Sequence, residues 1–202
     1  MNDTLYDKSL KIENSKIDNL EVTLEQFSDL TLLGRVILSF LNAENLDNKI
    51  DRKTKLAYKI FSKDNEIGKV EFNHLIKHKR TIKKYMEYQS YINQAYEIVR
   101  LDNIVNYHRY IDMIEDTYWD IVASLCQENN IDPNIDKARI DFVQKNSDEI
   151  FDSIFQKLLS YVKKDINIQN TYKENKERAI TIILVKAFID CNILENPNGG
   201  NI

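Results

Sequence analysis

Glycine and proline, the residues that most often interrupt regular secondary structure, are scarce in this chain. Its 202 residues include four Gly and two Pro. Sheet proteins with many tight turns usually need more of both, because these residues supply the backbone conformations of turns. The scarcity favours a few long helices. We predict an all-α fold, with six to eight helices in a single bundle-like domain.

Cysteine and long hydrophobic runs are also scarce. The two cysteines, Cys126 and Cys191, are too few for a disulfide framework, and their apolar helical surroundings predict small buried side chains. No run approaches the roughly 20 apolar residues of a membrane-spanning helix. A secretion signal has a basic segment followed by an apolar one, and the N-terminus of this chain lacks this pattern. We expect a cytoplasmic protein that does not contact membranes.

The charge balance is slightly acidic. The chain carries 28 Lys and Arg against 32 Asp and Glu, a formal net charge of −4. This balance argues against nonspecific binding of nucleic acid over the whole surface, but it leaves room for a local basic patch. The abundance of Ile, Asn, Lys and Tyr is typical of an AT-rich genome, which indicates a bacterial or phage source.

Three regions follow from the hydrophobic pattern. Residues 1–22 have scattered apolar residues without a clear period, and we expect a loosely ordered arm. Residues 23–195 form the helical domain, and residues 196–202 form a flexible tail that begins with Asn-Pro-Asn-Gly-Gly. Within the domain, residues 63–68 read as a turn in which Gly68 takes a positive φ.

The central stretch, Lys69–Asn129, contains no Gly and no Pro, and its apolar residues recur at helical spacing. These 61 residues are too many for one ordinary helix. We expect a break between Arg100 and Asn103, where the side chain of Asp102 or Asn103 accepts hydrogen bonds from a new first turn. The result is a pair of long helices, folded back on each other, with Trp119 in the inward apolar stripe.

Helix starts are also marked in the C-terminal third. Asp132-Pro133 has the residues of an N-cap and a first helical position, and Ser147 marks a second start. The last helix is expected over Tyr172–Asn192. It is apolar nearly all round from Ala179 to Ile189, which places it at the centre of the core. Its β-branched residues also suit a buried strand, which is the alternative.

Charged residues of opposite sign gather on the two halves of the central stretch. The basic block consists of Lys77, His78, Lys79, Arg80, Lys83 and Lys84, and the acidic ridge of Asp112, Glu115, Asp116 and Asp120. If the two helices fold back on each other, the block and the ridge face one another as exposed ion pairs. The ridge would bind Mg²⁺ or Mn²⁺ only if carboxylates from another helix joined it.

The basic block is also a candidate nucleic-acid surface. Lys77, Lys79, Arg80, Lys83 and Lys84 suit phosphate contact, and Tyr88 and Tyr91 follow them as candidates for base stacking. We expect these two tyrosines to be exposed, whereas Tyr85 shares the apolar stripe and belongs to the core.

A weak metal motif overlaps the same region. Glu71, His74 and His78 stand at positions i, i+3 and i+7 of one expected helix, so two imidazoles and a carboxylate share a face. The stronger helical zinc motif has Glu directly after its first His, and Leu75 stands there. A polar helix face beside a basic patch is the simpler interpretation.

Arg100 and His108 form a second weak candidate site. The pair resembles the Arg-then-His motif of helical HEPN ribonucleases, with seven residues between the two, a longer spacing than in that motif. The resemblance implies RNA cleavage with both residues in the catalytic site. An ordinary surface histidine is the alternative.

The leading function is therefore a non-enzymatic interaction protein, an adaptor or accessory subunit that binds another protein. The chain has three His with no matched nucleophile and base, no phosphate-binding Gly loop and no Cys pairs for zinc. We expect no cofactor, and a homo-oligomer stays possible. The alternatives are a nucleic-acid-binding protein and an HEPN-like or metal-dependent nuclease.

Overall fold

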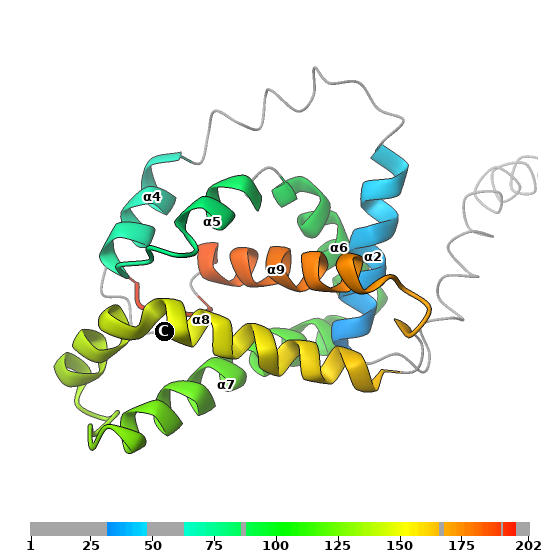
Figure 1. The fold of residues 1–202 in the computed structure, drawn as a ribbon. Helices are drawn as coiled ribbons and strands as arrows, with labels where there is room; N and C mark the ends of the chain where they lie inside the picture. Colours follow the sequence, from blue (N-terminus) through cyan, green and yellow to red (C-terminus); the bar gives the residue numbers. More distant parts are fainter. Residues whose placement is uncertain (1–31, 48–62, 86–87, 166–167, 191, 197–202) are drawn as a thin grey trace, which may run out of the picture. The chain divides into compact units, whose positions relative to one another are not determined.

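The fold consists of helices. The computed structural model describes residues 32–47, 63–85, 88–165, 168–190 and 192–196, and within these ranges it has seven α-helices and no strand. The helices are α2 (Leu32–Asp47), α4 (Lys63–Phe72), α5 (Lys79–Tyr85), α6 (Gln89–Asp102), α7 (Ile104–Glu128), α8 (Asp136–Lys164) and α9 (Lys173–Ile189) (Figure 1). The all-α prediction is confirmed. The expected N-terminal arm 1–22 and nearly all of the tail lie outside the described residues.

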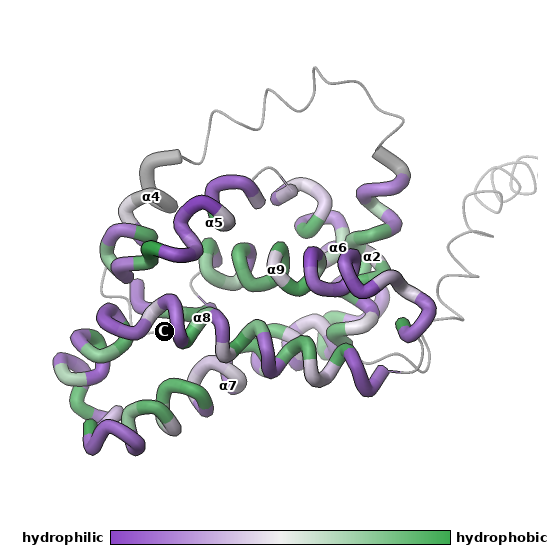
Figure 2. Tube along the Cα trace, in the orientation of Figure 1, coloured by the Kyte–Doolittle hydropathy of each residue, from purple (hydrophilic) through white to green (hydrophobic). Residues whose placement is uncertain are grey.

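The last helix, α9, lies at the centre of the core, as its sequence predicts. Its buried side chains are Ala179, Ile180, Ile182, Ile183, Leu184, Val185, Ala187 and Phe188. Helices α2, α5, α6 and α8 pack against it. In Figure 2 the half of α9 that passes between α5 and α8 is coloured as hydrophobic. The segment is a helix and not a strand, because neighbours on several sides bury apolar side chains all round it.

The break between α6 and α7 falls where the sequence places it. Asn103 has an extended backbone (φ −159°, ψ 109°) that interrupts the helical path. Its Oδ1 accepts hydrogen bonds from the backbone N–H groups of Val105 at 2.9 Å and Asn106 at 3.1 Å. These contacts satisfy two of the free donors in the first turn of α7, and they confirm the N-cap at this position.

The first half of the central stretch is not one long helix, which corrects the sequence-based prediction. Helix α4 ends at Phe72 in a Schellman motif. The N–H of Leu75 donates to the carbonyl of Val70 and that of His74 to Glu71, both at 3.1 Å, and His74 has a φ of 53°. Val70 and Leu75, the two positions whose apolar side chains commonly accompany this motif, are both buried. The chain therefore leaves the helix at a histidine, where sequence patterns lead one to look for glycine.

The segment predicted as a turn before the central stretch is part of α4. Gly68 lies inside this helix, is exposed and does not have a positive φ. The expected turn of residues 63–68 is therefore wrong. The turn occurs ten residues later, because the capping contacts of His74 and Leu75 end the helix there.

Helix α8 joins the two helices that the sequence predicts. It has a kink at Asn146 (φ −117°, ψ 16°), one residue before the expected start at Ser147. The other expected start, with Asp132 as N-cap and Pro133 as first helical residue, is wrong by three residues. Asp132 Oδ1 accepts from the N–H of Asn134 at 2.9 Å and closes a turn, and the helix begins at Asp136.

Two side chains test the core that the sequence predicts. Cys126 is fully buried, as expected, and Cys191 lies outside the described residues. Trp119 is 46% exposed, although the apolar stripe places it inward, and the Arg139 guanidinium lies 5.3 Å from its ring centre. The helical periodicity gave the wrong environment for Trp119. An aromatic ring at the edge of an apolar stripe can pack against an arginine guanidinium at the surface instead of in the core. None of the described helices combines the length and the apolar character needed to cross a membrane.

Candidate interaction surface

The turn between α4 and α5 is fastened to α8 by a carboxylate. Asp148 accepts hydrogen bonds from the backbone N–H groups of Ile76 at 3.1 Å, Lys77 at 2.9 Å and His78 at 3.3 Å. These donors precede α5 and would otherwise face water or remain unpaired. A side chain from a distant part of the chain therefore holds three successive residues of the turn in place.

A second carboxylate, one turn further along α8, holds two side chains of the same turn. Asp152 pairs with the Lys77 ammonium and lies 3.0 Å from Nε2 of His78. The His78 ring also stacks on Phe151, with ring centres 4.5 Å apart. His78 therefore joins the turn to α8, a structural role that explains its position.

The predicted metal motif does not exist as one helical face. Glu71 lies in α4 and pairs with Lys79 at 3.6 Å, His74 lies exposed in the Schellman turn, and His78 precedes α5. The expected shared face is absent because α4 ends at Phe72, between the first and last members of the motif. Across the part of the chain that the structure describes, no group of three or more His, Cys, Asp or Glu side chains could hold a metal ion.

The tip of the turn is an apolar side chain. Ile76 is 82% exposed, the largest exposure among the exposed large hydrophobic residues of the described ranges. A surface hollow of about 430 Å³ lies beside it, lined by His74, Ile76 and residues 144–149 of α8. Lys145 and Glu149 line this hollow with opposite charges, and the kink at Asn146 shapes its α8 side.

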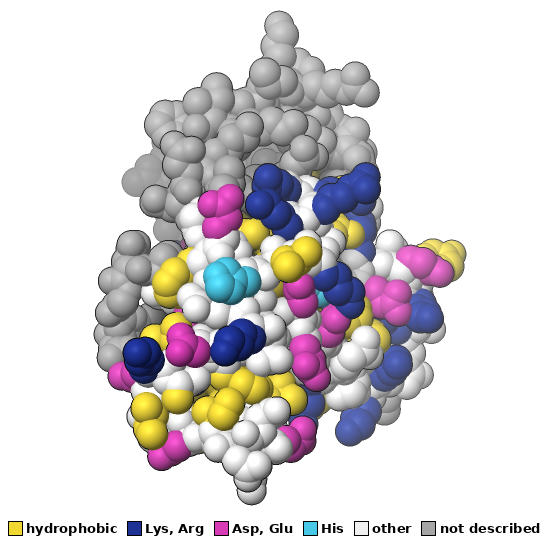
Figure 3. All heavy atoms as spheres, turned by 60° about the vertical axis from the view of Figure 1, so that its left-hand side comes forward, with side chains coloured by type: hydrophobic (Ala, Val, Ile, Leu, Met, Phe, Trp, Pro, Cys, Tyr) yellow, Lys and Arg dark blue, Asp and Glu magenta, His cyan; other side chains and the backbone are white. Residues whose placement is uncertain are grey.

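Helix α5, which follows the turn, has exposed cationic side chains. Ile82 is fully buried and fixes which side of α5 faces the core. Arg80, Lys83 and Lys84 are exposed, and none of the ion pairs in the described ranges includes them. Figure 3 shows Lys and Arg side chains gathered on this face at the level of α5, with hydrophobic and His side chains below them. We call Ile76, Arg80, Lys83 and Lys84 the α4–α5 surface.

The acidic ridge does not pair with the basic block. The carboxylates that meet Lys77 and Lys79 are Asp152 and Glu71. In the ridge, Glu115 accepts a hydrogen bond from the Asn192 side chain at 2.6 Å. The pairing considered from the sequence does not occur, because the turn before α5 is bound to α8 and α5 itself packs on α9.

The two tyrosines expected to stack on bases are not free to do so. Tyr91 is only 7% exposed, which contradicts the sequence-based prediction. Tyr88 is half-buried, with its ring 6.5 Å from that of Phe40 and 5.9 Å from the Arg178 guanidinium. Tyr85, which we expected in the core, is also half-buried, and the Lys84 ammonium lies 5.4 Å from its ring centre.

Arg100 and His108 lie on different helices, on either side of the Asn103 break. The Arg100 guanidinium pairs with Glu97 on its own helix at 2.6 Å, and this contact raises its pKa. His108 is exposed on α7, and its ring lies beside that of Tyr107. The structure shows no contact between the two residues of the HEPN-like pair among those it describes.

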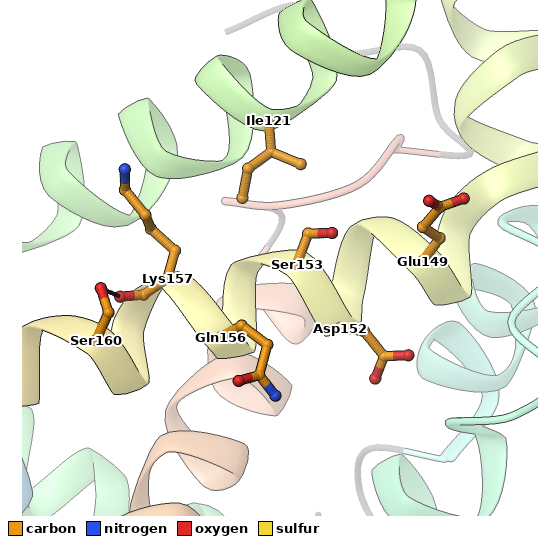
Figure 4. Close-up of a pocket in the computed structure, with 7 residues that line it drawn as sticks. All are labelled: Ile121, Glu149, Asp152, Ser153, Gln156, Lys157 and Ser160. Carbon is orange, nitrogen blue, oxygen red and sulfur yellow. Dashed lines mark hydrogen bonds between the residues drawn. The ribbon is translucent and has the colours of Figure 1, made fainter. Parts of the chain in front are cut away.

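The groove between α7 and α8 offers no evident catalytic arrangement. It has a volume of about 660 Å³ and is lined by Ile121, Glu149, Asp152, Ser153, Gln156, Lys157 and Ser160 (Figure 4). Ser160 donates its hydroxyl proton to the Lys157 carbonyl at 2.7 Å, and Asp152 is already engaged by Lys77 and His78. Neither serine is within hydrogen-bond distance of a base, as an activated nucleophile would be.

A second group of polar contacts joins Glu195, near the C-terminus, to the helical domain. Asn73 exchanges hydrogen bonds with the backbone of Glu195, at 2.8 and 2.9 Å. The Glu195 carboxylate accepts from Tyr118 and from Arg139, both at 3.3 Å. Burial and this carboxylate raise the pKa of Tyr118 far above its ordinary value, so its hydroxyl keeps its proton. Sequence reasoning missed this cluster, because its members are far apart in the chain and none belongs to a motif.

The comparisons with known proteins give no relative. The sequence matches no protein-family model, and neither a curated protein nor a solved structure matches the chain.

Proposed function

We propose that this chain is a non-enzymatic interaction protein, an adaptor or accessory subunit that binds another protein through its α4–α5 surface. The observation that carries this proposal is Ile76, which is 82% exposed on a turn whose backbone donates three hydrogen bonds to Asp148. Binding through a preordered turn costs little conformational entropy, so such a side chain contributes more of its burial energy to affinity. Cytoplasmic location remains our expectation, and the free, buried Cys126 agrees with it.

The experiment is affinity purification of the tagged protein from cells of its source, with I76S as the test variant. Leu101 supplies a matched control, because it is 77% exposed and lies far from the turn in sequence, at the end of α6. We expect a protein partner that is recovered with the wild type and with L101S and is lost with I76S. A partner lost with L101S and retained with I76S would contradict the proposal, and so would the absence of any specific partner.

Nucleic-acid binding is the second candidate, favoured by the three exposed cations of α5 that have no ion pair among the described residues. Contact with about three phosphates would give a slope of about −3 in the dependence of log affinity on log salt for duplex DNA. Charge reversal in R80E/K83E should then abolish binding to a labelled duplex. Binding that survives this change would remove the candidate.

A further inference from the structure

We infer that the α4–α5 surface binds an acidic segment of a partner protein that carries a large aliphatic side chain. This inference rests on the proposed function and adds the chemistry of the partner. It follows from an exposed apolar side chain on the turn that leads into α5, a helix whose three exposed cations no carboxylate of the described chain neutralises.

The three α5 cations that have no ion pair within the described ranges share one side of the helix. Arg80, Lys83 and Lys84 stand at positions i, i+3 and i+4, which brings their side chains together on the helix surface. Ile82 points the other way, into the core, and is fully buried. The cationic side of α5 therefore faces outward as a unit, held in orientation by its buried residue.

Positive charge is left over on this surface after the internal pairs are formed. Lys77 and Lys79 are engaged by Asp152 and Glu71. Two further carboxylates lie nearby. Asp148 accepts its three backbone hydrogen bonds, and Glu149 lines the hollow beside Ile76 together with Lys145. What remains for a partner is the positive charge of α5, which selects an anionic surface by charge complementarity.

The apolar component separates an acidic protein from a nucleic acid. Ile76 gains nothing from a phosphate backbone, whereas an aliphatic side chain of a partner can bury it. The hollow beside Ile76, of about 430 Å³, has room for such a side chain. Base stacking would need exposed aromatic rings, and Tyr91 is buried while Tyr88 packs on Phe40. The observations therefore favour an acidic, apolar-bearing protein segment.

The test uses three fluorescein-labelled probes and the full-length protein. The first probe is a synthetic glutamate peptide with two leucines at its centre, and the second has serines in place of the leucines. The third is a single-stranded oligonucleotide of the same net charge. Fluorescence anisotropy measures the affinity of each probe at several salt concentrations.

Two pairs of variants separate the apolar from the electrostatic component. I76S is compared with L101S, and R80E/K83E with K163E/K164E, which reverses two exposed lysines at the other end of α8. We expect the leucine peptide to bind the wild type, and I76S to weaken it by about tenfold, to the level of the serine peptide. R80E/K83E should weaken it by about tenfold or more, since both changes replace an attraction by a repulsion. The two control variants should bind as the wild type does, and thermal melting checks that all four are folded.

Three results would overturn the inference. They are equal affinity for the leucine and serine peptides, tighter binding of the oligonucleotide, and no binding of the leucine peptide. If a partner is still recovered from cells in an Ile76-dependent manner, only the chemistry of the partner is wrong and the proposed function stands. If that recovery fails as well, both are wrong.

Discussion

The hydroxyl oxygens of Tyr96 on α6 and Tyr110 on α7 lie 3.0 Å apart in the interior of the protein. Their rings meet edge to face, with centres 5.4 Å apart and an angle of 74° between the planes. Both side chains are buried, and Tyr110 is fully so. Each hydroxyl is thus the hydrogen-bonding partner of the other, and the pair links the two helices on either side of the Asn103 break.

This pairing predicts non-additive effects of substitution. Y96F or Y110F alone leaves one buried hydroxyl without its partner, which should lower the free energy of unfolding by about 1–3 kcal/mol. The double variant removes both hydroxyls and should cost clearly less than the sum of the two single changes. Urea unfolding of the four proteins at neutral pH measures this. Strict additivity would mean that the two hydroxyls do not interact.

The same pair predicts a loss of stability at alkaline pH. Burial raises the pKa of both Tyr96 and Tyr110 above its ordinary value. In the unfolded chain a tyrosine releases its proton near pH 10, whereas the folded protein keeps it. The unfolded state therefore binds fewer protons as the pH rises past about 10, and the free energy of unfolding falls.

We expect this fall to be smaller in Y96F/Y110F than in the wild type, because the variant lacks two of the groups that cause it. Urea unfolding at increasing pH, compared between the two proteins, gives the difference. Exposed tyrosines and lysines titrate in both proteins, so their contributions cancel in the comparison. Equal pH dependence in the two would show that the pair does not resist ionisation.

The cap of α7 predicts a loss of stability without a change in the core. Asn103 is exposed, and its side chain accepts hydrogen bonds from Val105 and Asn106. N103A should lower the free energy of unfolding by about 1 kcal/mol, within the range of 0.5–2 kcal/mol for lost N-caps. N103D and N103S keep an acceptor and should remain close to the wild type. If all three variants lost the same stability, the side-chain cap would not be the cause.

Replacement of Gly68 by alanine should stabilise the protein. It is exposed inside α4, it does not have a positive φ, and an added Cβ would meet nothing within 4 Å. G68A should raise the free energy of unfolding by about 0.5–1 kcal/mol, because alanine loses less backbone entropy in a helix. G68P should instead destabilise the protein by about 3 kcal/mol. If the segment were a turn, as its sequence indicates, G68A would show no such gain.

Substitution of Asp148 should lower stability and loosen the turn of the α4–α5 surface. D148A removes the acceptor of three backbone N–H groups, and the loss should resemble that of a helix cap, about 1–2 kcal/mol. D148N keeps one acceptor oxygen and should lose less. Hydrogen exchange of the amides of Ile76, Lys77 and His78 is the direct measurement. Unchanged protection of these amides in D148A would show that the carboxylate does not hold the turn.

Local features determined much of the fold from sequence. The all-round apolar character of Ala179–Ile189 can be satisfied only in the interior, and this placed α9 at the centre of the core. Asn103 could be predicted as a cap because the acceptor and the donors are neighbours in the chain. The kink in α8 beside Ser147 has the same local origin. In these cases the physical cause lies within a few residues of its effect.

Contacts between distant residues decided the candidate site. The turn that ends α4 has His74 in a conformation that sequence rules assign to glycine, and the flanking Val70 and Leu75 are buried. The turn that follows is held by Asp148, some seventy residues away. That turn separates Glu71 from His78 and exposes Ile76. The spacing of residues along the chain does not indicate which carboxylate will bind which distant turn. The α4–α5 surface could therefore be placed only from the tertiary structure.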